Sequence, residues 1–292
     1  MILDKKLEEL KSDYQNIPIP DNLDFIVANA ISRSSVRKFP FKSVIGLAAS
    51  AIFILSINSS PTFAKTLSDV PIVGNLVDVL TFTEYTVDEK TYQAHLKVPA
   101  VSNLKNKDLE NSLNQKYLNE NKQLYDTFTK EMDEMKKENG GHLGIDSGYE
   151  VKTDTDNILS IGRYVVNTVG SSSTTMTYDT IDKKNEILLT LPLLFKDETY
   201  INLISENIKE QMKEQMKHDE NKLYWFRDEG DETTIGLFDK ISSKQNFYIN
   251  KDNQLVISFD KYEVAPGAMG IIEFIIPSDI LSDALVSNHY IK

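Results

Sequence analysis

Residues 43–64 carry no charged side chain, and they follow a hydrophilic segment, residues 1–42, instead of starting the chain. As a helix rising about 1.5 Å per residue, this window would reach about 33 Å, enough to cross a hydrocarbon core of about 30 Å. Its most apolar part, residues 44–57, has the length of a signal-peptide core. A buried helix in a soluble domain is the alternative, but the turn-prone residues 58–61 (NSSP) and a one-sided basic flank argue against it. We expect a transmembrane signal anchor.

The charges beside this window predict its orientation. No acidic residue lies between Asp24 and the window, whereas four basic residues do: Arg33, Arg37, Lys38 and Lys42. By the positive-inside rule, the N-terminus is then cytoplasmic and the C-terminal part is extracellular. We therefore expect a single-pass protein of the cell membrane with a cytoplasmic segment (1–42), a span (43–64), a juxtamembrane segment with a protease site (65–80) and an extracellular domain (81–292).

The acidic character of the chain lies almost wholly outside the membrane in this arrangement. The formal net charge is −12, and residues 1–42 are close to neutral. Such a charge argues against nucleic acid or anionic lipid as an outer partner and favours a cationic ligand, although acidity can also serve solubility alone. Because the chain has no cysteine, it can form neither a disulfide framework nor a thiolate metal site. This composition suits a Gram-positive cell surface.

The cytoplasmic segment shows helical periodicity that needs a partner. A first helix is predicted before the Pro-containing break at residues 17–20, and a second helix follows Asp21. Two short helices cannot bury their own apolar faces, so we expect them to fold against a cytoplasmic protein rather than lie on a membrane surface. The side chains predicted to make this contact are Leu7, Leu10, Tyr14, Leu23 and Ile26.

The outer part alternates between strand and helix patterns. Apolar residues at fourfold spacing predict long helices over 107–135 and around Ile204 and Ile208, and a short helix is expected over 70–80. The order of elements predicts an α+β domain with a mostly antiparallel sheet and two long helices, preceded by the transmembrane helix and the short helical cytoplasmic segment. Strands are predicted over 91–98, 158–169, 174–180, 186–194, 247–249, 255–259 and 271–276.

No pattern of catalytic residues is present. The four histidines, His95, His142, His218 and His289, are far apart, and none belongs to a zinc-binding motif. The serine run 171–173 is interpreted as a solvated hairpin turn, and the acidic run 228–232 as a solvated loop that lacks the calcium-binding register of an EF-hand. We therefore expect no enzymatic activity, no cofactor and no metal.

Two other segments stand out. Residues 264–270 form a Pro-Gly turn with small apolar side chains, for which a tight structural turn and a binding tip are equally plausible interpretations. Residues 223–227 cluster aromatics with the one tryptophan and are interpreted as core. After the apolar window, Thr62 and Ala64 place small side chains where a signal peptidase requires them, which predicts cleavage between Ala64 and Lys65 rather than after Thr66.

The chain resembles the RsiV-type anti-sigma factors, membrane inhibitors of the extracytoplasmic-function sigma factor sigma-V, along nearly its whole length. The resemblance is carried by residues 11–20 with Leu23, 107–112, 116–118, 180–185, 189–191, 194–198, 207–215, 259–263 and 266–267. It implies that the N-terminal segment inhibits a sigma factor and that the outer domain is a receptor for lysozyme. Lysozyme binding then exposes the chain to signal peptidase and to an intramembrane site-2 protease.

The resemblance also implies ligand contacts at Ser172, Pro266 and Ala268. The chain departs from the family in two places, because relatives carry Tyr where this chain has Ala268, and their Ala before the cleaved bond aligns with Thr66. The tip therefore lacks a large aromatic anchor. Two other interpretations of the outer domain are a cell-wall glycan-binding module, since similar domains accompany peptidoglycan deacetylases, and a lysozyme inhibitor without signalling.

Overall fold

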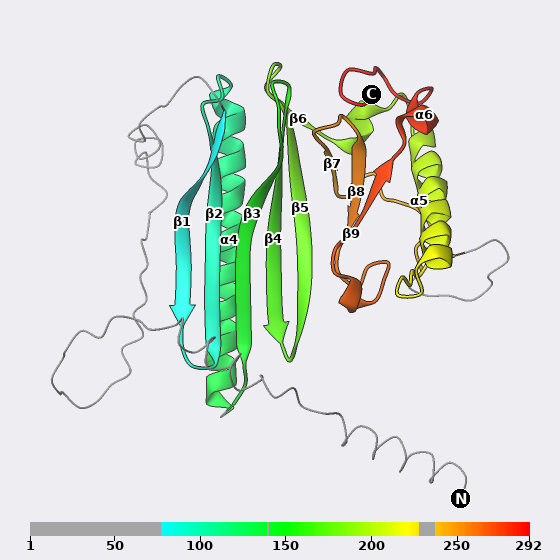
Figure 1. The fold of residues 1–292 in the computed structure, drawn as a ribbon. Helices are drawn as coiled ribbons and strands as arrows, with labels where there is room; N and C mark the ends of the chain where they lie inside the picture. Colours follow the sequence, from blue (N-terminus) through cyan, green and yellow to red (C-terminus); the bar gives the residue numbers. More distant parts are fainter. Residues whose placement is uncertain (1–76, 139, 228–236) are drawn as a thin grey trace, which may run out of the picture. The chain divides into compact units, whose positions relative to one another are not determined.

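The computed structural model describes residues 77–138, 140–227 and 237–292 (Figure 1). The predicted cytoplasmic helices, the span, the cleavage site and the acidic run 228–232 lie outside the described residues. Within them, no helix combines the length and the apolar character that crossing a membrane requires.

The larger layer is a six-stranded sheet whose spatial order follows the sequence. Neighbouring strands are antiparallel except β2 and β3, which run parallel because the helix α4 connects them. The hairpin between β4 and β5 turns at Gly170 alone, whose φ of 73° is left-handed and therefore favours glycine. The strands are β1 (Asp78–Asp88), β2 (Tyr92–Ser102), β3 (Leu143–Asp154), β4 (Ile158–Val169), β5 (Ser171–Asp182) and β6 (Ile187–Leu189).

Helix α4 (Lys107–Lys137) packs along one face of this sheet (Figure 1). It begins at the N-cap Asn106, whose side chain accepts a hydrogen bond from the Leu109 amide at 3.1 Å. Its fourfold apolar spacing buries Leu113, Tyr117, Phe128 and Met132 against side chains of β2, β3 and β4. The long helix predicted over 107–135 is thus confirmed.

A buried charge cluster links α4 to β4 and β5. Asp179 of β5 accepts from Lys116 Nζ at 2.8 Å and from Arg163 Nε at 3.2 Å, and Arg163 also pairs with Glu120. The Arg163 guanidinium lies 4.5 Å from the ring centroid of Tyr117. Although burial acts to lower the pKa of Arg163, the attraction of Asp179 and Glu120 outweighs it and raises that pKa.

The smaller layer is an antiparallel three-stranded sheet of β7 (Phe247–Ile249), β8 (Leu255–Phe259) and β9 (Ile272–Ile276). Helix α5 (Thr199–His218) packs on it with Ile204, Ile208 and Met212 fully buried. All five residues of β8 are buried, since one face meets this core and the other faces β5. The remaining elements are η1 (Leu191–Leu194), η2 (Gly267–Met269) and α6 (Ser278–Leu281).

Side-chain hydrogen bonds join the two sheets. Glu273 of β9 accepts from Tyr178 of β5 at 3.0 Å and from Tyr248 of β7 at 3.1 Å, and it pairs with Lys152 of β3 at 3.1 Å. Burial raises the pKa of both tyrosines, so their hydroxyls remain protonated donors. The Ile249 carbonyl accepts from the hydroxyl of Thr153 at 2.7 Å. These polar contacts, which we call the seam, join the two sheets in addition to their apolar contacts.

The α+β class with a mostly antiparallel sheet is confirmed, as are the strand 158–169 and the hairpin strands 247–249 and 255–259. The short helix expected over 70–80 is wrong where the structure describes it, since β1 begins at Asp78. The strand expected over 186–194 ends at Leu189, because Pro192 begins a 3-10 turn and cannot donate to a sheet. The serine run 171–173 lies in β5 and not in a turn.

Replacing Arg163 with Ala should destabilise residues 65–292 by about 3 kcal/mol, because it leaves the buried Asp179 without one of its two cationic partners. Urea unfolding would measure the loss. The matched control is Lys217→Ala, which removes an exposed pair with Glu214 and should cost about 0.5 kcal/mol or less. Equal losses for the two variants would contradict a structural role for the cluster.

Candidate functional site

The predicted ligand residues come from two separate elements. Ser172 is the second residue of β5, directly after the Gly170 turn. Pro266 is the N-cap of η2 and Ala268 lies within η2, in the long loop (residues 260–271) between β8 and β9. Ala268 is exposed and Pro266 is half-buried. We call residues 260–271 the receptor loop, a name that refers only to the predicted ligand contacts at Pro266 and Ala268.

Lys261 connects these two elements. Its Nζ donates to the Ser172 carbonyl at 2.7 Å and lies 2.9 Å from the Ser172 hydroxyl. Its backbone amide donates to the Thr174 carbonyl at 3.1 Å. The structure therefore brings Ser172 against the start of the same loop that carries Pro266 and Ala268, which the sequence alone did not predict.

The receptor loop closes the open edge of β5. On the edge away from β4, the described part of the chain pairs no strand with β5 except β6, at residues 180–182. The Met176 amide donates to Asp260 Oδ1 at 2.7 Å, and the Met176 carbonyl accepts from Asn246 Nδ2 at 2.8 Å. These bonds satisfy backbone groups that would otherwise be available to another chain.

The first turn of the loop carries two carboxylates. The Asp260 amide donates to Glu263 Oε2 at 2.7 Å, and the Glu263 amide donates to the Asp260 carbonyl at 3.0 Å. Burial raises the pKa of both groups, because removal from water disfavours the charged form. Tyr262 lies between them with a left-handed φ of 75°.

The second half of the loop is a tight turn. The Met269 amide donates to the Pro266 carbonyl at 2.9 Å, and Gly270 reverses the chain with a φ of 71°. Val264 and Ala265 are buried, and the Val264 carbonyl accepts from the Trp225 amide at 2.8 Å. The turn predicted over 264–270 is thus confirmed, and its role as a binding tip stays a prediction.

The aromatic segment 223–227 supports this loop. Tyr224 is buried, its ring lies 5.8 Å from that of Phe274, and its hydroxyl donates to Gln215 at 2.5 Å. Leu223 is 48% exposed, and its amide lies 3.4 Å from Met269 Sδ. The interpretation of the segment as core is therefore confirmed for Tyr224, whereas Leu223 lies at the surface beside the loop.

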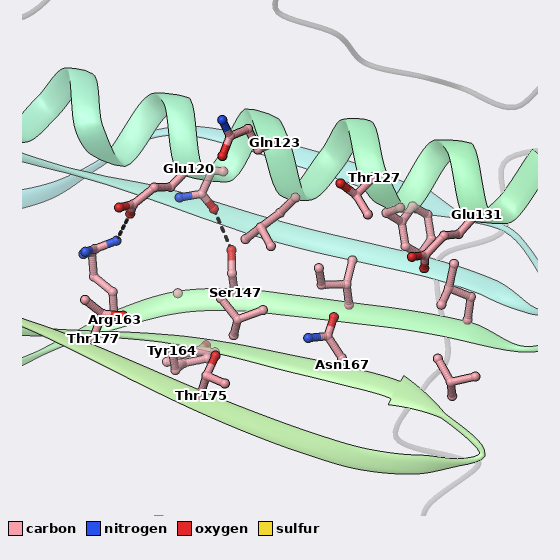
Figure 2. A pocket seen from close by; sticks show the side chains of 18 of the residues that line it. Glu120, Gln123, Thr127, Glu131, Ser147, Arg163, Tyr164, Asn167, Thr175 and Thr177 are labelled. Atoms are coloured by element: carbon pink, nitrogen blue, oxygen red, sulfur yellow. Dashed lines mark hydrogen bonds and ion pairs between the residues drawn. The ribbon is translucent and has the colours of Figure 1, made fainter. Parts of the chain in front are cut away.

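A groove of about 680 Å³ lies between α4 and strands β3 to β5 (Figure 2). Helix α4 presents Glu120, Gln123, Thr127 and Glu131 to it, and the strands present Asn167, Thr175 and Thr177. Near its floor the Ser147 hydroxyl donates to Asn121 Oδ1 at 2.7 Å. Leu124, Phe128 and Ile145 make the floor apolar. The groove was not predicted, because its residues are isolated polar positions of elements far apart in the sequence.

The described residues contain no cluster of three or more His, Cys, Asp or Glu that could hold a metal ion. His95 lies between Glu84, at 3.6 Å, and Asp146, at 3.3 Å, on the opposite face of the sheet from α4. In the receptor loop, the carboxylates of Asp260 and Glu263 each accept a hydrogen bond from a backbone amide.

Comparison with known proteins gives matches to two families, to a relative of similar length and to solved structures. Residues 85–167 match the family described as deacetylase PdaC, and residues 193–279 match the family described as a protein of unknown function (DUF3298). The chain is 47% identical to the anti-sigma-V factor RsiV of Bacillus subtilis (strain 168), over 99% of this chain and 100% of that protein.

One solved structure shares the fold. A crystal structure of a DUF3298 family member from Bacteroides fragilis superposes with a TM-score of 0.52 at 16% identity, covering 73% of this chain and 94% of that one. A DUF3298 family protein from Pseudomonas aeruginosa gives a TM-score of 0.49 at 11% identity, covering 74% of this chain and 96% of that one.

Replacing Lys261 with Met should loosen the receptor loop, because the Met side chain cannot donate to Ser172. Hydrogen exchange read by mass spectrometry should become faster in peptides covering 171–176 and 260–271 together. Lys251→Met, at an exposed position in the turn between β7 and β8, serves as the control and should change neither peptide. Unchanged exchange in 171–176 would show that Lys261 does not link the two elements.

Proposed function

This chain belongs to the RsiV family of anti-sigma factors, and from that premise we propose that it sequesters an extracytoplasmic-function sigma factor and releases it after lysozyme binds outside the cell. The observation that carries the proposal is the length of the match, since 47% identity extends over 99% of the chain. A shared receptor domain alone would leave the first 76 residues unmatched. The regulatory role of the relative also favours a protein without enzymatic activity.

In this proposal residues 1–42 hold the sigma factor at the cytoplasmic face through Leu7, Leu10, Tyr14, Leu23 and Ile26. An apolar helical face without an internal partner is the usual form of a segment that folds on binding. Residues 43–64 anchor the chain in the membrane. The outer domain then acts as the sensor.

Release proceeds by two cuts. Signal peptidase cleaves between Ala64 and Lys65, and a site-2 protease then cleaves within the span. The described domain begins with Val77, which is buried in the same apolar cluster as Leu113 and Tyr117 of α4, so at most residues 65–76 separate the anchor from a packed core. At about 3.5 Å per residue this distance is no more than about 40 Å. A protein bound to the domain is therefore close enough to the membrane to influence access to the cleavage site.

The ligand surface in this proposal is formed by Ser172, Pro266 and Ala268. Two features support it: the chain carries a net charge of −12, which attracts a cationic protein, and Lys261 places Ser172 beside the loop that carries the other two residues. A cell-wall glycan module is the second candidate. It is favoured by the polar-rimmed groove, which lies largely within the region matched by the deacetylase PdaC family.

Full-length protein in detergent should bind egg-white lysozyme, and its affinity should fall as salt rises, because opposite charges are screened. Ala268→Tyr should strengthen binding by roughly five- to thirtyfold, because burying the apolar surface of the added ring contributes about 1 to 2 kcal/mol of binding free energy. Ser172→Trp should weaken binding by displacing Lys261. Calorimetric titration would measure all three effects. If soluble peptidoglycan fragments bind while lysozyme does not, the glycan module is the better description.

Replacing Leu10 and Ile26 together with Asp should release the sigma factor without ligand, because charge on an apolar face opposes its burial. A reporter gene under sigma-factor control should then be active in the absence of lysozyme. Lys6→Asp introduces the same charge beside the predicted face and should keep repression. Repression that persists in the double variant would place the sigma-binding surface elsewhere.

A further inference from the structure

Tyr262 is the only exposed aromatic side chain within residues 77–138, 140–227 and 237–292. Its exposed fraction is 47%, whereas the other described aromatics are buried or half-buried. Single exposed apolar residues are common on protein surfaces. Exposure alone therefore assigns no role, and the geometry around the ring has to decide.

The backbone of Tyr262 is held in a costly conformation. Its φ of 75° lies in the left-handed region, which bulky side chains rarely adopt. Glycine or asparagine would adopt it with less strain. Non-glycine residues in such conformations persist where the surroundings enforce them, and they gather at binding and active sites. The turn between Asp260 and Glu263 enforces this one through the two hydrogen bonds described above.

The ring of Tyr262 contacts both halves of the candidate site. A Cβ atom placed on Gly267 would lie 2.1 Å from Cε1 and Cζ of the ring, so the ring rests directly on the Gly267 backbone between Pro266 and Ala268. Lys261 Nζ, which holds Ser172, lies 5.2 Å from the ring centroid. Tyr262 therefore lies where the Ser172 end and the Pro266 end of the site meet.

We propose that Tyr262 is a ligand-contact residue that supplies an aromatic anchor of the lysozyme-binding surface; this inference rests on the proposed function. Tyrosine combines a large apolar face with a polar tip and is enriched among residues that dominate binding energy. The partner is a cationic protein, whose lysine or arginine side chains can contact an aromatic face or a phenol oxygen. Leu223, whose amide lies 3.4 Å from Met269 Sδ, and Ala268 add exposed apolar side chains at the same loop.

Biolayer interferometry with the full-length chain in detergent and egg-white lysozyme tests this role. Tyr262→Ala should weaken binding at least about tenfold, whereas Tyr262→Phe should stay within about threefold, because it keeps the ring. Val286→Ala, which trims a side chain that is 60% exposed outside the receptor loop, is the matched control and should bind as the parent does.

Tyr262→Gly separates binding from folding. Glycine relaxes the left-handed backbone, so the melting temperature should not fall while the affinity does. A residue that only stabilises the loop would give the opposite pattern, a lower melting temperature with affinity retained. Gly267→Ala provides a second test, since its methyl group must displace the ring. It should weaken binding in the parent and have no further effect in the Tyr262→Ala background.

The outcomes distinguish this inference from the function on which it rests. A parent chain that binds lysozyme, together with Tyr262→Ala and Tyr262→Gly variants that bind equally well, overturns the role of Tyr262 and leaves the receptor function standing. A parent chain that does not bind lysozyme overturns both. Loss of affinity in Tyr262→Gly with an unchanged melting temperature supports the anchor.

Discussion

Strand β5 is the element on which the rest of the described structure depends, because its two faces and its open edge each hold a different part of the molecule. Side chains of a strand alternate between faces. Asp179 therefore points to the side of the sheet that α4 covers, where it meets Lys116 of α4 and Arg163 of β4. Its neighbour Tyr178 points to the smaller sheet, where it meets Glu273. The edge is occupied by the receptor loop through Met176 and Asp260. A shift of one residue in the register of β5 would exchange all of these partners.

The candidate site is a consequence of closing that edge. An edge strand exposes backbone groups that can pair with another chain, and this fold covers them with Asp260 and Lys261. The same contacts place Ser172 against Lys261, at the start of the loop that carries Pro266 and Ala268. The loop is also tied to the smaller sheet at both ends, since β8 precedes it and β9 follows it. The two flanking strands also contact β5, since Ser258 of β8 and Glu273 of β9 both lie within hydrogen-bond distance of the Tyr178 hydroxyl.

Local patterns predicted the helices and several strands, and non-local contacts explain the misses. Helix α4 was predictable because its apolar side chains, at fourfold spacing along 31 residues, face one sheet. Strand β3 was missed because Gly144, Ser147 and Gly148 interrupt its apolar alternation. Strand β1 was missed because its Thr-rich sequence follows an apolar segment for which a helix was predicted. Ser172 was assigned to a turn, whereas the hairpin needs Gly170 alone. Its contact with Lys261 joins residues 89 positions apart, which no local pattern reveals.

Steric constraints within the receptor loop differ sharply between neighbouring positions. Ala268 is exposed, so packing does not set the size of its side chain, and a larger residue there is compatible with the same fold. Gly267 is covered by the ring of Tyr262 and tolerates no Cβ unless that ring moves. The resemblance includes residues 259–263, so Tyr262 belongs to the shared pattern, and its ring lies against Gly267, next to Ala268. A larger side chain at position 268 would therefore add to the exposed surface beside this ring without altering the hydrogen bonds by which Lys261 and Asp260 attach the loop to β5.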